Sequence, residues 1–352
     1  MKKSLQISLI LFLLVLVFLL LLPSVNLRLS GTVEVQLLAL NDFHGSLLPP
    51  DEFAGRGIKD DAGGVEYLAT HIANLQARNP NTIVVSAGDA IGLSPQPSSL
   101  FHDEPTIEAF NLIGVELSAV GNHDLENGID DLLRMQEGGC HPLDGCLDGD
   151  DFEGAHFHFL AANMTWKKDN SLVFPAYEIR KFDGVPVAFI GIALERTPAT
   201  VSADLSELNF MDEAETVNAL VPELKKQDIE TIVVLLHEGG SQIPRTSHYN
   251  KCVGMTGRVV DIVNKLDDAV DVVLSGHEEF PYNCVINKKI VTNAYSFGRL
   301  ITKVDLTLDR RTGDVVTMTA ENLIVTRDVP KDSRLTVLID KYVSLAASLD
   351  IR

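Results

Sequence analysis

The sequence has few basic residues and no cluster of them. Its 352 residues include 29 Lys and Arg against 49 Asp and Glu, which gives a formal net charge of -20 at pH 7. Binding the phosphate backbone of a nucleic acid requires clustered Lys and Arg, so this composition argues against a nucleic-acid polymer as a partner. A small anionic substrate can still bind where metal ions supply positive charge locally.

Cysteine is also scarce, and its spacing does not suit a zinc site. The chain has 4 cysteines and no paired C-x-x-C units of the kind that hold structural zinc. Cys140 and Cys146 flank a short polar loop, whereas Cys252 and Cys284 bracket a predicted helix and strand. We therefore predict two disulfides, Cys140–Cys146 and Cys252–Cys284, which are typical of an exported protein.

The N-terminus carries an export signal or an anchor. Lys2 and Lys3 precede an almost unbroken apolar run from Ile7 to Leu22. The run is long for the core of a signal peptide and slightly short for a spanning helix, and no small-x-small cleavage site follows it. We predict that residues 1–30 are either a signal peptide or an N-terminal membrane anchor. In both cases the protein is exported, and it is either secreted or membrane-anchored.

Apolar runs alternate with amphipathic segments over the first two thirds of the chain, which indicates βαβ units. Later strand-like runs, such as Val285 to Thr292 and Leu300 to Leu308, suggest antiparallel additions. Two sheets packed face to face with outer helices fit both patterns. Apolar residues at helical spacing predict a final helix over Ser333 to Leu349.

Five short polar signatures each follow a run rich in Val, Ile or Leu. Such runs are typical of buried parallel strands, and ligands bind at the carboxyl ends of these strands. We therefore expect the signatures to meet in one crevice. They are Asp42-Phe43-His44, Gly88-Asp89, Gly121-Asn122-His123-Asp124, His237-Glu238 and Gly276-His277-Glu278-Glu279.

These signatures supply ligands for two metal ions. Asp42 and His44 alternate at a strand end, so both side chains are expected on one side, where they can bind one ion. Asp89 can bridge this ion to a second one. Two-metal sites orient a hydroxide and clamp phosphate oxygens during in-line attack. The remaining nitrogen and amide donors for the second ion are Asn122, His237 and His277.

His123 follows the metal ligand Asn122 and is expected to face a bound phosphoester. We assign it as the general acid or electrostatic stabiliser of the leaving oxygen. Asp124, the next residue, is expected to orient the His123 ring and fix its tautomer.

Three signatures with their neighbours carry a family likeness: Asn41-Asp42-Phe43-His44-Gly45, Gly121-Asn122-His123-Asp124 and His237-Glu238-Gly239-Gly240. In this order they resemble the calcineurin-like metallophosphoesterases, and most closely the 5'-nucleotidase family, over roughly Val33 to Thr326. The resemblance implies an α/β fold, a four-layer αββα sandwich of two mixed sheets flanked by helices, with residues 31–329 as the catalytic domain. It also implies two divalent metal ions (manganese, zinc or magnesium), hydrolysis of nucleotides or related small phosphoesters by a metal-bound hydroxide, and the same ligands and catalytic dyad. Substrate contacts are expected from Gly45 and Asn163.

The sequence departs from the family at two places. Glu279 stands where members usually have His and sometimes Gln. As a ligand it would favour manganese or magnesium over zinc, but it could also weaken the site. In addition, residues 330–352 hold only the start of the linker to the C-terminal domain that gives the family its nucleotide specificity. The apolar face of Ser333 to Leu349 is then a candidate surface for a partner polypeptide that supplies this half.

Two alternatives to a nucleotidase stay open. A phosphodiesterase acting on 2',3'-cyclic nucleotides or nucleotide sugars would use the same metal centre. The other is a catalytically weakened subunit that binds metal or ligand in a split enzyme. Glu279 and the missing domain favour this second alternative, whereas the complete set of other ligands favours an enzyme.

Overall fold

The computed structural model describes residues 31–50 and 61–349. The predicted signal peptide or anchor, residues 1–30, lies outside these ranges. None of the helices within them is both long enough and apolar enough to cross a membrane. Both predicted disulfides, Cys140–Cys146 and Cys252–Cys284, are confirmed.

The first of two large sheets has six strands. Four of them, β1 to β4, run parallel to one another. Beyond β1 the sheet continues with β13, which is antiparallel to β1, and β14, which is antiparallel to β13. Across the sheet the strands are β14 (Val315–Ile324), β13 (Leu300–Asp309), β1 (Thr32–Leu40), β2 (Thr82–Ser86), β3 (Val115–Ala119) and β4 (His158–Leu160).

The second large sheet also has six strands. Its four central strands are parallel, and one antiparallel strand closes each edge. Across the sheet the strands are β11 (Tyr282–Ile286), β12 (Lys289–Asn293), β10 (Val272–Ser275), β9 (Thr231–Leu236), β7 (Val185–Ile192) and β6 (Tyr177–Phe182). A separate pair is formed by β5 (Met164–Trp166) and β8 (Leu208–Phe210).

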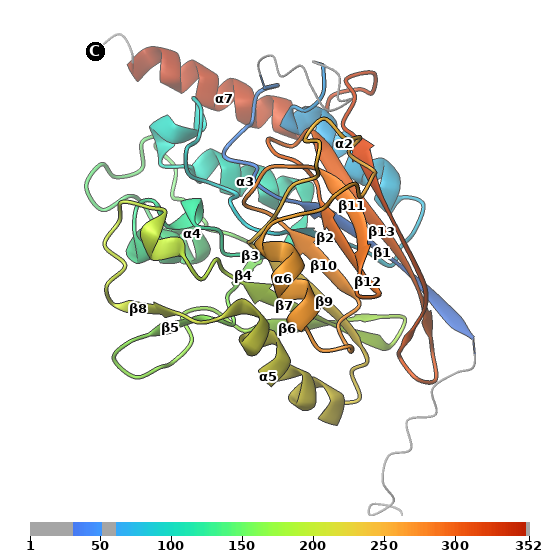
Figure 1. Ribbon diagram of the computed structural model, residues 1–352. Coiled ribbons are helices and arrows are strands. Elements are labelled where there is room, and N and C mark those ends of the chain that lie inside the picture. Colours follow the sequence, from blue (N-terminus) through green and yellow to red (C-terminus); the bar gives the residue numbers. More distant parts are fainter. Residues whose placement is uncertain (1–30, 51–60, 350–352) are drawn as a thin grey trace, which may run out of the picture.

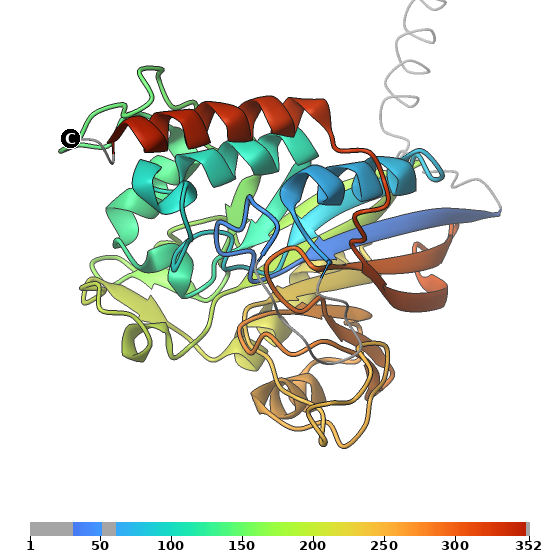
Figure 2. The same cartoon turned by 90° about the horizontal axis from the view of Figure 1, so that it is seen from above.

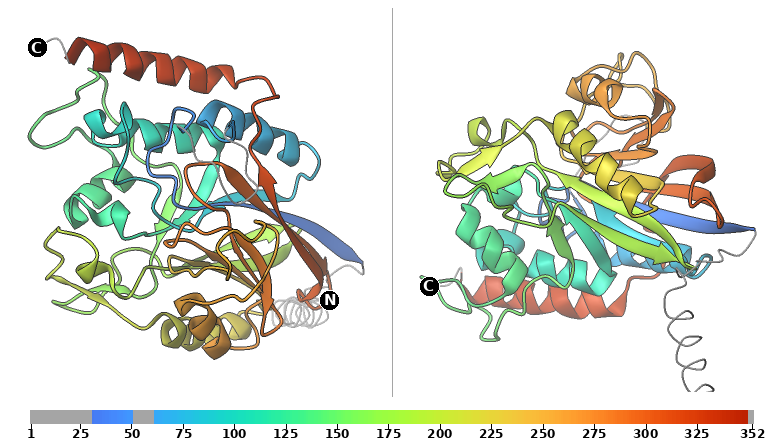
Figure 3. Two further views of the ribbon diagram at one scale, coloured as in Figure 1. Left: turned by 45° about the horizontal axis from the view of Figure 1, so that its top comes forward. Right: turned by 90° about the horizontal axis from the view of Figure 1, so that it is seen from below.

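Helices cover the outer face of each sheet, so the layers are helix, sheet, sheet, helix (Figure 1). Seen from above, α7 lies along α3 with α2 on the same side of the molecule (Figure 2). Seen from below, α5 and α6 lie on the opposite side of the strands from α7 (Figure 3). The fold is therefore the predicted four-layer α/β sandwich of two mixed sheets. The helices are α2 (Val65–Gln76), α3 (Glu104–Ile113), α4 (Ile129–Glu137), α5 (Glu213–Lys226), α6 (Arg258–Lys265) and α7 (Ser333–Leu349).

Alternation along the strands produces these layers. Leu37 and Val85 point into the core between the two sheets, where Leu235 from the second sheet meets them. The next residue along β1, Leu38, points the other way, toward α2 and α3. Val234 likewise packs toward α5 and α6. Both faces of the central strands are thus buried, which explains their nearly continuous apolar sequences.

The apolar face of α7 packs against the domain itself. Leu335, Leu338, Ile339 and Tyr342 are at most 8% exposed and belong to the core that contains α2 and α3. The hydroxyl group of Tyr342 donates to Glu108 of α3 at 3.0 Å. This face is therefore covered, and the predicted partner surface on Ser333 to Leu349 is wrong.

The predicted strand from Val285 to Thr292 is a hairpin. Asn287 and Lys288 both have positive φ, at 46° and 66°, and they turn the chain between β11 and β12. Consecutive residues of positive φ make the tight turn that matches the twist of a hairpin. The apolar pattern predicted one continuous strand across Asn287, and this turn was therefore missed.

Candidate metal centre

The loop after β1 carries Asp42 and His44 in left-handed conformations. Each has a φ of 48°, which is uncommon for residues other than glycine. The loop after β2 holds them there, because Asp42 N–H donates to Gly88 O at 3.0 Å and His44 N–H donates to Asp89 O at 3.1 Å. Both side chains reach the same site, as predicted, but strand alternation is not the cause: β1 ends at Leu40, and the turn brings them together.

Two glycines allow the loops to approach each other closely. A Cβ atom on Gly88 would lie 2.5 Å from Nδ1 of His237, and one on Gly121 would lie 2.1 Å from Oδ1 of Asp89. Both distances are shorter than a van der Waals contact, so a larger residue at either position would push the loops apart. The glycines of the Gly-Asp and Gly-Asn-His signatures are therefore required by packing around Asp89.

The first group of candidate ligands is Asp42, His44 and Asp89, whose donor atoms all lie within 4.8 Å of one another. Glu279 joins this group, because its Oε1 atom lies 3.5 Å from Nε2 of His44. Nδ1 of His44 lies 2.8 Å from the carbonyl oxygen of Gly92. A carbonyl oxygen only accepts, so Nδ1 carries a proton and, in the neutral ring, Nε2 presents its lone pair to the carboxylates.

The second group is Asp89, His237 and His277, so Asp89 belongs to both groups. Nδ1 of His237 donates to the carbonyl oxygen of Ala87 at 2.8 Å, which leaves Nε2 directed at the site. This Nε2 atom lies 3.0 Å from Oδ1 of Asn122 and 3.1 Å from Oδ2 of Asp89. Nδ1 of His277 lies 2.9 Å from the same Asn122 oxygen.

This arrangement fits divalent cations. When the His44 and His237 rings are neutral, each directs a nitrogen lone pair at oxygen atoms that can only accept hydrogen bonds, so these atoms repel one another. A cation bound between the nitrogen and oxygen atoms would be attracted by both. Burial alone would lower the pKa of His237, yet the Asp89 carboxylate raises it to about 9. Burial would also lower the pKa of His44, but Glu279 and Asp89 raise it to about 10. The cluster thus attracts positive charge.

The carboxylates of the cluster are fully enclosed. Asp42 is 0% exposed and Asp89 is 1% exposed. Burial raises the pKa of Asp42 to about 7, whereas the neighbouring His237 holds the pKa of Asp89 below its usual range against the effect of burial. Buried carboxylates at this distance from each other need compensating charge, which agrees with a cation site.

His123 lies at the edge of the cluster, but its partner is not the predicted one. Its backbone N–H donates to Oδ1 of Asp89 at 2.8 Å, and its ring Nδ1 lies 2.8 Å from Oε1 of Glu126. The rings of His123 and His44 meet edge to face with centroids 5.2 Å apart. The expected contact of His123 with Asp124 is therefore wrong, and Glu126 orients the ring.

Asp124 instead holds the backbone around Asp89. Its carboxylate accepts the N–H groups of Gly121 at 2.7 Å and of Asp89 and Ile91 at 3.1 Å each. Asp124 is 3% exposed. It supports the loop that presents Asp89, and its carboxylate faces the backbone, not the imidazole.

Comparison with known proteins assigns the family. The family model of the calcineurin-like phosphoesterases matches residues 35–279. This chain belongs to that family. Further relatives, which are 26% and 23% identical to this chain, are named 5'-nucleotidases.

Individual relatives match most of this metallophosphoesterase chain. Endonuclease YhcR of Bacillus subtilis is 33% identical over 89% of this chain and 25% of its own length. Cell wall protein Lmo0130 of Listeria monocytogenes is 31% identical over 88% of this chain and 42% of its own length. A 5'-nucleotidase precursor from Thermus thermophilus has the same fold, with a TM-score of 0.71 and 20% identity over 90% of this chain and 59% of that chain. The chain thus spans less than half the length of the two sequence relatives.

The two residues predicted to touch substrate have structural roles in this metallophosphoesterase. Asn163 is 0% exposed, and its amide group donates to the carbonyl oxygens of Ala193 and Met211 and accepts the N–H of Ala193. Gly45 is buried, and a Cβ atom on it would lie 2.3 Å from Oγ of Ser94. Both residues thus have packing or hydrogen-bonding roles, and their contact with substrate stays a prediction.

Sequence reasoning missed two residues that position the site. Glu126 orients His123. A carboxylate three residues after a histidine in a turn could have indicated this pair from the sequence. Asn41 donates to Oδ2 of Asp42 at 2.5 Å and to Tyr295 O at 2.6 Å, so it ties the first ligand to the second sheet. Its position immediately before Asp42 was the available signal.

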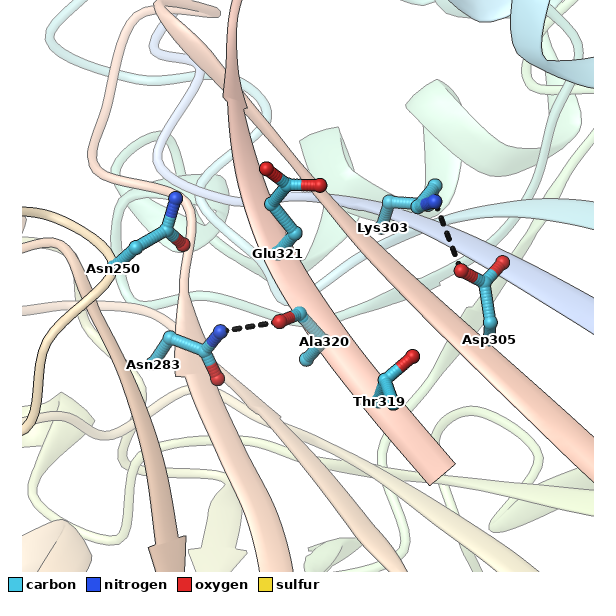
Figure 4. Close-up of a pocket in the computed structure, with 7 residues that line it drawn as sticks. All are labelled: Asn250, Asn283, Lys303, Asp305, Thr319, Ala320 and Glu321. Carbon is cyan, nitrogen blue, oxygen red and sulfur yellow. Dashed lines mark hydrogen bonds and ion pairs between the residues drawn. The ribbon is translucent and has the colours of Figure 1, made fainter. Parts of the chain in front are cut away.

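A polar groove elsewhere on the metallophosphoesterase shares no residue with this cluster. It has a volume of about 350 Å³ and is lined by Asn250, Asn283, Lys303, Asp305, Thr319, Ala320 and Glu321. Figure 4 shows that Lys303 pairs with Asp305 and that the Asn283 amide donates to the carbonyl oxygen of Ala320. The groove contains no histidine, so the metal chemistry belongs to the cluster around Asp89.

Proposed function

We propose that this chain hydrolyses nucleotides or related small phosphoesters with two divalent ions that share Asp89. The observation that carries the proposal is the convergence of Nε2 of His44 and Nε2 of His237 on one oxygen of this carboxylate, Oδ2, at 3.8 Å and 3.1 Å. Asp42 and Glu279 complete the first set of ligands. Asn122 and His277 complete the second. When bound, such ions supply positive charge for the phosphate oxygens and activate a water molecule for in-line attack.

The residues of the chain have separate tasks in this proposal. His123 is 22% exposed, whereas Asp89 and His237 are buried, so its ring borders the cluster on a side that solvent reaches. It can donate a proton, or a hydrogen bond, from Nε2 to the leaving oxygen, because Glu126 holds the opposite nitrogen. Asp124 and Asn41 keep the ligand loops in place. The buried walls exclude bulk water, which strengthens every charge interaction at the site.

Glu279 is the residue that sets the choice of metal. Its Oε1 atom lies 3.5 Å from Nε2 of His44, the nitrogen that faces the site. With Asp42 and Asp89 it gives the first ion three carboxylates, and oxygen donors favour manganese or magnesium over zinc. This geometry favours a ligand role for Glu279 over the impaired binding subunit considered as an alternative.

The substrate is proposed by class. The absence of a Lys and Arg cluster favours a small substrate over a nucleic-acid polymer, although one relative is named an endonuclease. A two-metal centre can act on a phosphomonoester or on a phosphodiester. The proposal therefore keeps both a nucleotidase and a phosphodiesterase as candidate activities. The two disulfides and the apolar run near the N-terminus favour an exported protein, secreted or membrane-anchored.

The test is turnover by the purified protein with manganese, magnesium or zinc added to the metal-free form. We expect metal-dependent hydrolysis of 4-nitrophenyl phosphate or bis(4-nitrophenyl) phosphate, about two bound ions, and a loss of at least about a hundredfold in His123→Ala. Glu279→Ala should lose one of the two bound manganese ions, and Glu279→His should bind zinc more tightly. Two bound ions without any turnover would instead support the binding subunit.

A further inference from the structure

Arg196 lies beside the metal cluster on the loop that follows β7. The end of β7 is paired with the end of β9, where His237 N–H donates to Ile192 O at 2.9 Å. Arg196 therefore leaves the second sheet at the same edge that presents His237. Its guanidinium group is 51% exposed.

A neighbouring arginine is fixed by ion pairs, in contrast to Arg196. Arg258 donates from Nε to Glu238 at 3.0 Å and from Nη2 to Glu195 at 2.9 Å and to Glu213 at 3.2 Å. Arg258 thus serves a structural network of three carboxylates. Among residues 31–50 and 61–349, the one carboxylate paired with Arg196 is that of Glu238, at 3.5 Å.

That single contact leaves Arg196 able to bind another anion. Glu238 is 1% exposed and already accepts the N–H of Gly239 at 3.0 Å and Nε–H of Arg258. A guanidinium group has five N–H donors in a planar fork that matches phosphate oxygens. About half of the Arg196 side chain is exposed, so solvent and a ligand can reach it.

Arg196 is held close to the cluster, because its Nη2 atom lies 3.5 Å from Oε2 of Glu238, the residue that directly follows the proposed ligand His237. In the proposed function the two ion sites, which share Asp89, bind the phosphate group that reacts. The rest of the chain, with a net charge of -20, repels any further negative charge on a substrate. A second anionic group therefore needs a cation of its own outside the cluster.

We propose, resting on the proposed function, that Arg196 binds a second phosphate group of the substrate. The preferred substrates are then phosphoesters that carry two phosphate groups, of which nucleoside diphosphates are the simplest. Arg196 is a specificity-determining residue in this account, because it contacts the phosphate that does not react. It should contribute to KM and leave kcat unchanged.

The experiment compares ADP with AMP as substrates of the manganese-loaded protein. The wild type should show a lower KM for ADP than for AMP. Arg196→Gln should raise the KM for ADP about tenfold, since a charged hydrogen bond is lost, and change the KM for AMP less than about twofold. Arg196→Lys should restore part of the difference. The control is Arg334→Gln. Arg334 lies on α7, its side chain is 57% exposed, and it pairs with the carboxylate of Asp332.

A binding measurement separates this inference from the proposed function. Calorimetry with adenosine 5'-(α,β-methylene)diphosphate should give about a tenfold weaker Kd in Arg196→Gln, whereas the Kd of inorganic phosphate should not change. Equal effects on both probes, or no effect on either, would overturn the role of Arg196. If the wild type bound both probes but hydrolysed neither nucleotide, the proposed function would fail while the role of Arg196 in binding would still be decided.

Discussion

Nδ1 of His123 lies 2.8 Å from Oε1 of Glu126, three residues further along the same short turn. The other carboxylate oxygen of Glu126 accepts the backbone N–H of Leu93 at 2.8 Å. One side chain thus fixes both the imidazole ring and the loop that runs past it. The ring can only present Nε2 to the crevice, which is the orientation that an acid for a leaving oxygen requires.

Replacing Glu126 should therefore slow reactions that depend on His123. Glu126→Gln keeps the size of the side chain but removes the charge that holds the Nδ1 proton. We expect kcat to fall about 10-fold to 100-fold for phenyl phosphate, whose leaving group needs a proton. The loss should be much smaller for 4-nitrophenyl phosphate, whose leaving group needs little help. Steady-state kinetics with both esters measures this difference.

The matched control is Glu137→Gln, because Glu137 is exposed on α4. It should behave as the wild type with both esters. An equal loss for the two esters in Glu126→Gln would mean that Glu126 supports the loop at Leu93 and has no bearing on proton donation.

Asp124 should matter for stability and for metal content. Its two oxygens accept three backbone N–H groups from Gly121, Asp89 and Ile91. Asp124→Asn offers one acceptor oxygen and turns an NH2 group toward backbone donors, which leaves buried N–H groups without an acceptor. We expect a loss of about 2 kcal/mol or more in the free energy of unfolding. Urea denaturation and metal analysis would show it, with the exposed Asp130→Asn as the control.

The sequence was a good guide to which side chains lie close together, because the loops after parallel strands meet at one edge of a sheet. It misassigned the partner of His123 for a geometric reason. His123 begins a 3₁₀ turn, His123–Leu125, and residues three apart lie on the same side of such a turn. The neighbouring residue points elsewhere. Adjacency in sequence therefore suggested Asp124, whereas the turn geometry selects Glu126.

The layers of the fold were predictable for a similar reason, and the place of α7 was not. The alternation of side chains between the two faces of β1 and β9 follows from strand geometry alone. An amphipathic helix, however, does not reveal which surface it covers. Leu335 and Tyr342 pack against α2 and α3, because the chain comes back to these helices after β14. No local sequence pattern predicts this path of the chain.

Asp271 should make the stability of the protein depend on pH. Burial, reinforced by Asp314, raises its pKa from 3.8 to about 7, although its carboxylate accepts the N–H of Ile232 at 3.0 Å. A carboxyl group with a raised pKa in the folded state stabilises the fold below about pH 4, and this contribution is lost as the pH rises through about 7. Asp271→Asn keeps a neutral acceptor, so it should raise the Tm by about 2 to 5 °C at pH 8 and leave it unchanged at pH 3.5.

The control for this measurement is Asp268→Asn, because the side chain of Asp268 is 87% exposed. Its Tm should follow that of the wild type at both pH values. A gain for Asp271→Asn that is the same at pH 3.5 and pH 8 would point to a packing effect and exclude titration of Asp271 as the cause.

The two disulfides should differ in what they contribute to stability. Cys252–Cys284 closes a sequence separation of 32 residues, whereas Cys140–Cys146 closes one of 6. Restriction of the unfolded chain grows with the length of the closed loop, which predicts losses of about 3.7 and 2.2 kcal/mol when each pair is replaced by alanine. Because Cys284 is 1% exposed, alanine avoids burying a hydroxyl group there. Denaturant unfolding of the two double variants should therefore give a midpoint that is clearly lower for the Cys252–Cys284 pair, and metal content should be retained in both. Equal losses would mean that the unfolded chain already holds residues 252–284 close together, so that this bond restricts it little.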